Sequence, residues 1–266
     1  MKLAISSLAW TQAEWPEALK LLRSYGIKGI ELAPTTLWPT WEFTAQDAIN
    51  TRTALNQSGF EVPAMQSILY GVSANIFKGA PDQLKMKNHL RKVMDLAHYM
   101  GTPVLVWGAP ASRKKEGLTL NEAILDISPI LADWGDMAYS RKTCVCIEPN
   151  PRSYACDFIN TAQEGQQLVQ QVNSKGFGLH LDLGGLLLEG APLNEEMLKT
   201  LNPRHVHLSA EQLGSFQESP LDLMPQLVEL KKTGYTNWVS LEMRPLGLNT
   251  LEKAIIKAKD LMAALA

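Results

Sequence analysis

Short hydrophobic runs rich in β-branched residues alternate with longer stretches of helical periodicity along the whole chain. Runs such as 102–107 (TPVLVW) and 143–147 (TCVCI) are apolar at nearly every position, which is typical of parallel strands covered on both faces. Between the runs, apolar residues recur three and four positions apart, as in 84–100, and this spacing predicts amphipathic helices. The candidate strands begin near Leu3, Gly29, Val62, Pro103, Cys144, Gly178, His205 and Trp238.

Eight strands, each followed by a helix, predict a (β/α)8 barrel of the TIM type. An open doubly wound sheet is the main alternative, but it usually carries a glycine-rich phosphate turn after its first strand, and residues 6–15 contain no glycine. Thr11 and Glu14 have the spacing of a capping box at the start of the first helix, and Gly26 follows its end. No proline- or serine-rich linker divides the 266 residues, so a single domain over 1–266 is expected.

Composition and charge narrow the class of protein. Apolar residues make up 45% and charged residues 20% of the chain, which is ordinary for a globular domain. The formal net charge is −2 and no long run of Lys or Arg appears, so no nucleic-acid partner is expected. The short basic cluster at 113–115 is interpreted as a solvated loop. No apolar stretch approaches the roughly 20 residues that cross a bilayer, so no membrane association is expected.

The three cysteines, Cys144, Cys146 and Cys156, form an odd set without the spacing of a disulfide framework. Cys144 and Cys146 alternate with apolar strand residues, so they are expected to be buried. The apolar run at residues 1–10 is too short for a secretory signal and makes a better first strand. These features predict a reduced, cytoplasmic protein.

Two segments that follow strands are long and rich in aromatic residues. Residues 33–43 contain Trp38 and Trp41, and residues 67–77 contain Tyr70 and Phe77. The loops that follow strands build the functional face of such a barrel. The aromatic side chains could therefore line a pocket for a sugar-like ligand, or they could pack onto the neighbouring helices, and the sequence leaves both open.

Four metal-compatible side chains fall at the ends of the last four predicted strands. The intervals between them are 34, 25 and 35 residues, one β/α unit each, which places them on neighbouring strands at similar height. Three buried carboxylates would repel one another unless a cation lay between them. Three oxygen donors and one imidazole suit one divalent ion, Mn²⁺, Mg²⁺, Co²⁺ or Zn²⁺. The predicted ligands are Glu148, Asp182, His207 and Glu242.

Other histidines and one more glutamate have expected places around this set. His180 and His205 lie one pleat step below the strand-end ligands, so hydrogen bonding in the core or to a ligand is expected rather than metal binding. Glu31 faces the barrel interior and is interpreted as a further supporting group. His89 and His98 fall on an outer helix, where structural or surface roles are expected.

The four strand-end residues, with GIKGIEL at 26–32 and HVHL at 205–208, resemble the xylose isomerase-like barrel superfamily. The closer resemblance is to its sugar and sugar-phosphate isomerases and epimerases, and it covers essentially the whole chain. It implies that a metal ion polarises a carbonyl and an adjacent hydroxyl of a carbohydrate substrate. Glu148 and Glu242 would then be the catalytic pair, one removing a proton alpha to the carbonyl and the other returning a proton to the enediolate. Asp182 and His207 would mainly anchor the metal.

Several positions depart from the pattern of these relatives. Many relatives have a histidine where this chain has Gly185, and Lys-Asp where it has Ser209 and Ala210. Relatives that epimerise free ketoses tend to have an arginine and a glutamate where this chain has Leu213 and Tyr154. The particular sugar is therefore not determined. Candidates for binding it are Trp107, Asn150, Arg152, Asp157, His180, Glu211 and Arg244.

Three other functions are alternatives to an isomerase or epimerase. A dehydratase acting on an inosose-like ketone begins with the same proton abstraction, and a catalytically inactive barrel could still bind a sugar or act as a scaffold. Nuclease members of the superfamily hold three zinc ions in a histidine-rich site, whereas this chain has five histidines, two of them on an outer helix. The sequence therefore disfavours a nuclease and leaves the first two alternatives open. A homo-oligomer is compatible with the sequence, but no surface can be assigned to an interface.

Overall fold

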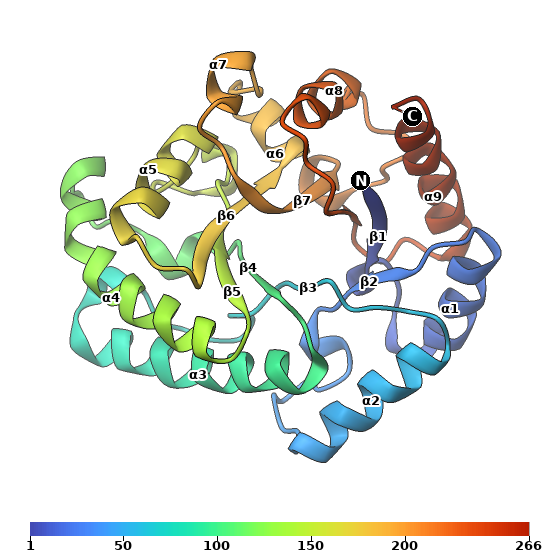
Figure 1. Cartoon of the computed structure of the whole chain (residues 1–266), viewed down its shortest axis with the longest axis horizontal. Helices are drawn as coiled ribbons and strands as arrows, with labels where there is room; N and C mark the ends of the chain where they lie inside the picture. The colour runs from blue at the N-terminus through green and yellow to red at the C-terminus, as the bar shows by residue number, and fades with distance from the viewer. Residues whose placement is uncertain (266) are drawn as a thin grey trace.

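The computed structural model describes residues 1–265 and shows eight parallel strands surrounded by helices (Figure 1). Neighbouring strands pair in the order β2-β1-β8-β7-β6-β5-β4-β3. The predicted (β/α)8 TIM barrel is confirmed, and the predicted strand starts agree with the structure within two residues. The strands are β1 Lys2–Ser6, β2 Gly29–Glu31, β3 Ala64–Met65, β4 Val104–Trp107, β5 Cys144–Ile147, β6 Phe177–Asp182, β7 Pro203–Ser209 and β8 Trp238–Glu242.

The barrel closes between β2 and β3 through backbone contacts that are sparser than those of the other strand pairs. Leu32 and Met65 form an isolated parallel bridge. The Leu32 N–H donates to the Ala64 carbonyl at 3.0 Å, and the Gln66 N–H donates back to the Leu32 carbonyl at 3.0 Å. Pro63 has no N–H to donate to a ladder, which explains why β3 begins later than the hydrophobic run predicts.

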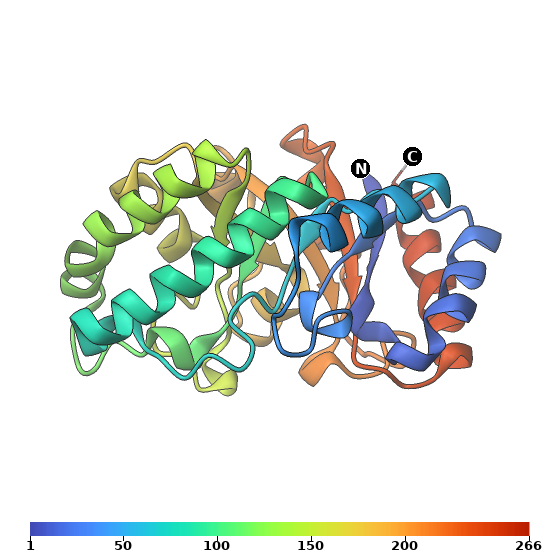
Figure 2. The ribbon, with the colours of Figure 1, turned by 90° about the horizontal axis from the view of Figure 1, so that it is seen from below.

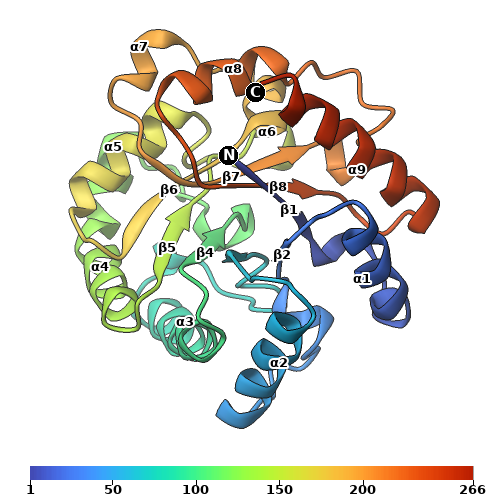
Figure 3. The same cartoon turned by 45° about the vertical axis from the view of Figure 1, so that its right-hand side comes forward.

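The helices form a ring outside the strands (Figures 2 and 3). The predicted capping box of Thr11 and Glu14 is present and leads through a short 3-10 turn into the first helix. Three later helices also begin at capping boxes, in which a threonine side chain accepts a backbone N–H. The helices are α1 Trp15–Ser24, α2 Ala45–Gln57, α3 Ala80–Met100, α4 Leu120–Ser140, α5 Ala162–Val172, α6 Leu183–Leu188, α7 Glu195–Leu198, α8 Met224–Lys232 and α9 Leu248–Ala263.

Burial confirms most of the expectations from hydrophobic patterning and corrects one. Cys144 and Cys146 are buried in β5, and His89 and His98 lie on α3 outside the barrel. The basic cluster at 113–115 is not a uniformly solvated loop, because Arg113 is completely buried. None of the helices among residues 1–265 combines the length and apolar character needed to cross a membrane.

Candidate active site

A cavity of about 460 Å³ opens at the carboxyl ends of the strands. This is the end at which (β/α)8 barrels place their functional loops. Its lining combines three acidic side chains and one imidazole with an apolar side formed by the loops after β3 and β4. The lining residues are Gln66, Ser67, Ile68, Leu69, Tyr70, Val106, Trp107, Gly108, Ala109, Pro110, Glu148, Asn150, Tyr154, Asp182, His207, Gln212, Leu213 and Glu242.

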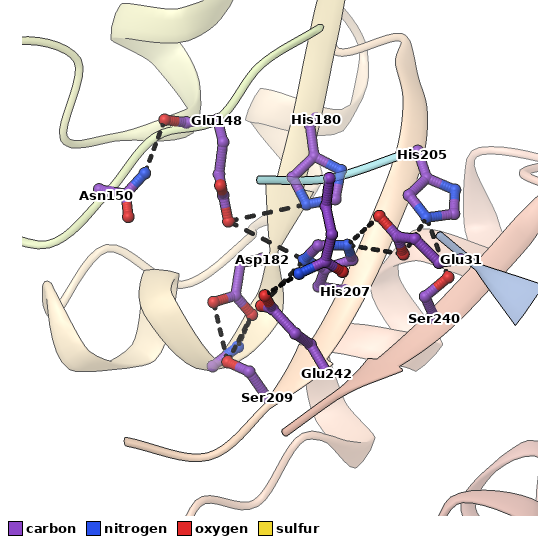
Figure 4. Close-up of polar contacts among 12 residues, drawn as sticks. Glu31, Glu148, Asn150, His180, Asp182, His205, His207, Ser209, Ser240 and Glu242 are labelled. Atoms are coloured by element: carbon purple, nitrogen blue, oxygen red, sulfur yellow. Dashed lines mark hydrogen bonds and ion pairs between the residues drawn. The ribbon is translucent and has the colours of Figure 1, made fainter. Parts of the chain in front are cut away.

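The four predicted metal ligands meet in this cavity (Figure 4). Glu148, Asp182 and Glu242 each offer a carboxylate oxygen, and these oxygens lie within 4.8 Å of one another. The Nδ1 atom of His207 is 3.2 Å from Oε2 of Glu242 and 4.0 Å from Oε1 of Glu148. The structure therefore brings together the residues whose spacing predicted neighbouring strands.

Burial makes this group of acids costly to ionise without a cation. Loss of solvation, together with the nearby charges of Glu242 and Asp182, raises the pKa of Glu148 to about 8 against the opposing effect of His207. Burial likewise raises the pKa of Asp182 to about 6, with Glu242 adding to the rise. A positive charge placed among the carboxylates would relieve both effects.

His207 is held between the acids of the cavity and a deeper carboxylate. Its Nε2 atom lies 2.9 Å from both carboxylate oxygens of Glu31, and its Nδ1 atom has no hydrogen-bond partner among residues 1–265. Burial opposes a charge on His207, but the carboxylates of Glu31 and Glu242 outweigh it and hold the pKa of His207 well above its usual value. Its Nδ1 atom therefore faces the carboxylates of Glu242 and Glu148.

These residues fit a divalent metal ion. The orphaned Nδ1 atom of His207 and the three converging carboxylates supply one nitrogen and three oxygen donors, a set suited to Mn²⁺, Mg²⁺, Co²⁺ or Zn²⁺. Glu148, Asp182, His207 and Glu242 would hold the ion. The fit rests on the chemistry of the donors and on a buried nitrogen that lacks a partner.

Several side chains that sequence reasoning missed orient the predicted ligands. The Ser209 hydroxyl donates to the carboxylate of Asp182, at 2.7 and 2.8 Å from its two oxygens. The Gln66 amide donates to Oε1 of Glu242. Ser209 had a readable signal, since it lies two residues beyond His207 on the same face of β7, whereas nothing in the sequence pairs Gln66 with β8.

The end of β5 is fixed by two donors and one close approach. The Arg113 guanidinium donates to the backbone carbonyl of Glu148 at 2.6 Å, and the Asn150 amide donates to the same carbonyl at 3.0 Å. Gly108 lies so close to Glu148 that a Cβ atom there would overlap Oε2 of the carboxylate. The absence of a side chain at Gly108 therefore leaves the space that the Glu148 carboxylate occupies.

The two deeper histidines differ in their surroundings. His205 Nε2 lies 2.9 Å from Oε2 of Glu31 and 3.0 Å from the Ser240 hydroxyl, so the expected hydrogen-bonded core role is confirmed. His180 is also fully buried, but neither of its ring nitrogens has a hydrogen-bond partner in the described part of the chain. Its Nε2 lies 3.8 Å from Oε1 of Glu148, beneath the cavity rather than in its lining.

The residues expected to bind substrate separate into two groups. Trp107 and Asn150 line the cavity. Arg152, Glu211 and Arg244 do not, and all three are exposed on the loops that follow β5, β7 and β8. The three side chains are thus exposed on these loops and lie outside the cavity, and their expected role in binding substrate stays a prediction.

Arg152, Arg244 and Asp157 make contacts outside the cavity. Arg152 forms an ion pair with Glu189. Asp157 accepts a hydrogen bond from the backbone of Lys115 and is absent from the cavity lining. The backbone N–H of Arg244 donates to the Leu213 carbonyl at 2.9 Å. None of these three side chains lines the cavity.

The positions at which relatives carry an arginine and a glutamate do reach the cavity. Leu213 and Tyr154 both line it. The Gln212 N–H donates to the Tyr154 hydroxyl at 2.7 Å, which ties the loop after β7 to the loop after β5. Both Gln212 and Leu213 have left-handed backbone angles, with φ of 52° and 53°. Because Leu213 and Tyr154 stand at these two positions, this side of the cavity is apolar and aromatic, whereas relatives carry charged residues there.

The sequence left open whether the aromatic segments at 33–43 and 67–77 line a pocket or pack onto neighbouring helices, and the structure shows both. Residues 67–70, including Tyr70, line the cavity. Trp41 instead packs edge-on against His89, with ring centroids 4.6 Å apart, and its indole N–H donates to the Tyr70 carbonyl at 3.0 Å. Phe77 packs against the buried Phe158. The segment at 33–43 therefore supports the loop that lines the cavity.

An eight-stranded parallel barrel with a carboxylate- and imidazole-lined cavity at the carboxyl ends of its strands defines the class of this protein. The chain belongs to the xylose isomerase-like TIM barrel family, whose model matches residues 19–265. The family resemblance expected from the sequence is thereby confirmed. No curated protein sequence gives a significant match to the chain.

Solved structures of similar fold include several sugar epimerases. D-psicose 3-epimerase from Clostridium cellulolyticum H10 is 15% identical with a TM-score of 0.80, covering 100% of this chain and 99% of that one. L-ribulose 3-epimerase is 18% identical with a TM-score of 0.80, covering 100% and 95%. The IOLI protein with a bound zinc atom is 18% identical with a TM-score of 0.72, covering 100% and 98%. At these identities the likeness establishes the fold alone.

Proposed function

We propose that this chain is a divalent-metal-dependent sugar isomerase or epimerase that transfers a proton alpha to a carbonyl. The observation that carries the proposal is the meeting of Glu148 and Glu242 in one cavity, with the free Nδ1 of His207 between the strands that bear them. Structural likeness to D-psicose 3-epimerase and L-ribulose 3-epimerase supports the same reaction class.

The residues of the cavity supply the proton transfers. A divalent ion, when bound, would stabilise negative charge developing on the carbonyl oxygen of the substrate. Glu148 directly follows β5 and Glu242 ends β8, and β6 and β7 lie between these two strands. The two carboxylates would therefore contact a substrate from two sides. One carboxylate removes the alpha proton and the other carboxylic acid returns a proton to the enediolate. Return to the same carbon inverts its configuration, and return to the neighbouring carbon exchanges aldose and ketose.

The charge of the cavity favours an unphosphorylated sugar. No Lys or Arg is among its lining residues, while three carboxylates are. A phosphate would find no cationic side chain there, and the carboxylates that hold the metal ion would repel it. Ile68, Trp107 and Leu213 offer apolar surface on which the nonpolar face of a sugar ring or chain can pack.

A solvent-deuterium exchange screen tests this function. The protein, supplied in turn with Mn²⁺, Mg²⁺, Co²⁺ or Zn²⁺, is incubated in D₂O with free ketoses, ketose phosphates and an inosose, and incorporation is followed by NMR. We expect deuterium to enter a free sugar, and Glu148→Gln or Glu242→Gln to slow incorporation by roughly 10²-fold or more. Glu211→Gln is the matched control, because this exposed glutamate lies outside the cavity and its loss should leave the exchange unchanged.

Other outcomes would redirect the assignment. Loss of a hydroxyl from the inosose, with a new carbonyl product, would make the protein a dehydratase. Metal binding without exchange into any compound would favour a catalytically inactive sugar-binding barrel. Exchange that survives both glutamate substitutions would contradict the proposed catalytic pair.

A further inference from the structure

A fully buried carboxylate lies beneath the proposed metal centre. Glu31 ends β2, has no exposed surface, and receives His205 and His207 at 2.9 Å each (Figure 4). Among residues 1–265, no Lys or Arg nitrogen lies within 4.0 Å of it, so its ion-pair partners are the two imidazoles. Only one of these imidazoles, His207, also lines the cavity.

We propose that Glu31 is a positioning residue that turns Nδ1 of His207 towards the cavity and thereby sets the affinity of the site for a divalent cation. This inference rests on the proposed function, because it assumes that a cation binds among Glu148, Asp182, His207 and Glu242. It adds a specific role for a residue that contacts neither cation nor substrate.

The two ring nitrogens of His207 have different roles. A neutral histidine carries its proton on one ring nitrogen and a lone pair on the other. An ionised carboxylate can only accept hydrogen bonds, so the Nε2 atom of His207 must carry a hydrogen to bond Glu31 at 2.9 Å. In the neutral ring that a cation needs as a ligand, the lone pair is then left on Nδ1, which faces the acids of the cavity and lies 3.2 Å from Oε2 of Glu242. Binding of a cation there would displace the proton that Nδ1 holds towards Glu242 in the metal-free protein. A metal-bound histidine is commonly fixed in this way by a carboxylate.

The position of Glu31 is itself fixed from several strands. Its strand pairs with β1, where Ser6 lies opposite it, and its two histidine partners come from β7 on the other side of the barrel interior. Ser240 on β8 contacts the same nitrogen of His205 that contacts Glu31. An isolated buried carboxylate is costly, so the side chain stays where both imidazoles reach it. The ring of His207 consequently has little freedom to rotate.

A glutamine at this position would have nearly the same shape but the wrong hydrogen-bonding capacity. Its amide has one accepting oxygen and one donating nitrogen, whereas Glu31 presents accepting oxygens to two histidines. Oε2 of Glu31 contacts both histidines and Oε1 contacts only His207, so an amide nitrogen at either position would meet the Nε2–H of His207. The conflict is relieved if His207 moves its proton to Nδ1 or turns its ring. Either change at His207 removes the lone pair from the cavity.

The decisive experiment measures cation affinity rather than turnover. Zn²⁺ and Mn²⁺ binding to the full chain and to Glu31→Gln is measured by calorimetry and by competition with a chelating dye. We expect Glu31→Gln to weaken binding by roughly 10- to 100-fold. Ser240→Ala is the control, because it removes a contact of His205 and leaves the Glu31–His207 hydrogen bonds in place, so its affinity should stay close to that of the parent.

A second measurement on the unaltered protein tests the same inference independently of whether Glu31→Gln folds. In the ¹⁵N-histidine-labelled protein loaded with Cd²⁺ or Zn²⁺, we expect Nε2 of His207 to carry a hydrogen and Nδ1 to show the shift of a metal-bound nitrogen. Binding through Nε2 would overturn the proposal. So would an unchanged cation affinity in a folded Glu31→Gln variant.

Failure of this inference can be told apart from failure of the proposed function. If the parent chain binds no cation, both are wrong. If it binds a cation and exchanges deuterium into a sugar while Glu31→Gln binds the cation equally well, only the role of Glu31 is wrong. A positioning role also requires that saturating cation restore most of the exchange rate in Glu31→Gln, whereas a direct role in proton transfer would leave the rate low.

Discussion

At the scale of single residues, Glu148 shows how burial of an acid couples the cavity to pH. Its folded pKa of about 8 lies above the ordinary glutamate pKa of 4.5, so between these pH values the folded chain binds more protons than the unfolded chain. Stability must then fall as pH rises through this window. The pKa of Asp182 is raised from 3.8 to about 6, so this acid also lowers stability as pH rises, over the lower part of the same pH range. Bound metal would remove this penalty by favouring the ionised acids.

We therefore expect the free energy of unfolding of the metal-free protein to fall by about a few kcal/mol between pH 5.5 and pH 8.5. Each unit by which the folded pKa exceeds the unfolded pKa corresponds to about 1.4 kcal/mol. Glu148→Gln cannot ionise and should lose less, so it should be more stable than the parent at the higher pH. Urea unfolding in the presence of EDTA at both pH values measures the difference. Equal losses in the two proteins would show that Glu148 is not the responsible acid.

At the scale of elements, the 3-10 turn Pro110–Arg113 is anchored to the end of β5 by one buried side chain. The Arg113 guanidinium donates to the Glu148 carbonyl, while its Nε and Nη1 atoms have no hydrogen-bond partner among residues 1–265. Burial lowers the pKa of Arg113, against the effect of nearby acidic groups that include Glu148. The loop after β4 and the strand end that carries Glu148 therefore hold each other in place.

Arg113→Ala should destabilise the protein by about 2–3 kcal/mol, because it removes a charged hydrogen bond and leaves a void beneath the loop. Lys114→Ala is the matched control, since Lys114 is the exposed neighbour in the same basic cluster and its loss should change stability by no more than about 0.5 kcal/mol. Chemical denaturation of the two variants measures both effects. Equal small changes would mean that Arg113 is dispensable for the loop.

At the scale of the whole molecule, closure of the barrel depends on close packing at its amino-terminal end. Gly29 on β2 is paired with Ala4 on β1, and the ring of Trp238 on β8 lies over it. A Cβ atom at Gly29 would lie 2.6 Å from the Cβ of Ala4 and would overlap the Trp238 ring. The missing side chain lets β1, β2 and β8 approach one another.

Gly29→Ala should therefore lower stability by about 1–3 kcal/mol through overpacking, with the strands forced apart or the indole displaced. Lys28→Ala, at the exposed preceding residue, should leave stability nearly unchanged. Thermal unfolding followed by circular dichroism and by tryptophan fluorescence measures both variants. A fully stable Gly29→Ala protein would show that this end of the barrel tolerates expansion.

The sequence by itself determined the number of strands, their alternation with helices and the convergence of Glu148, Asp182, His207 and Glu242. These features follow from local periodicity and from a repeating unit that delivers successive strand ends to one face. The start of β3 was placed two residues too early, because a proline and sparse bridges limit the local signal there, and the start of β7 was placed two residues too late.

Only the tertiary structure decided the partners that orient these residues. Gln66 meets Glu242 and Glu31 meets His207 across 176 residues in each case, and Arg113 turns inward from a cluster whose composition indicates a solvated loop. Arg152 turns outward although it follows β5 closely. Such contacts depend on loop conformation and on packing between distant segments, and neither leaves a periodic trace in the order of the amino acids.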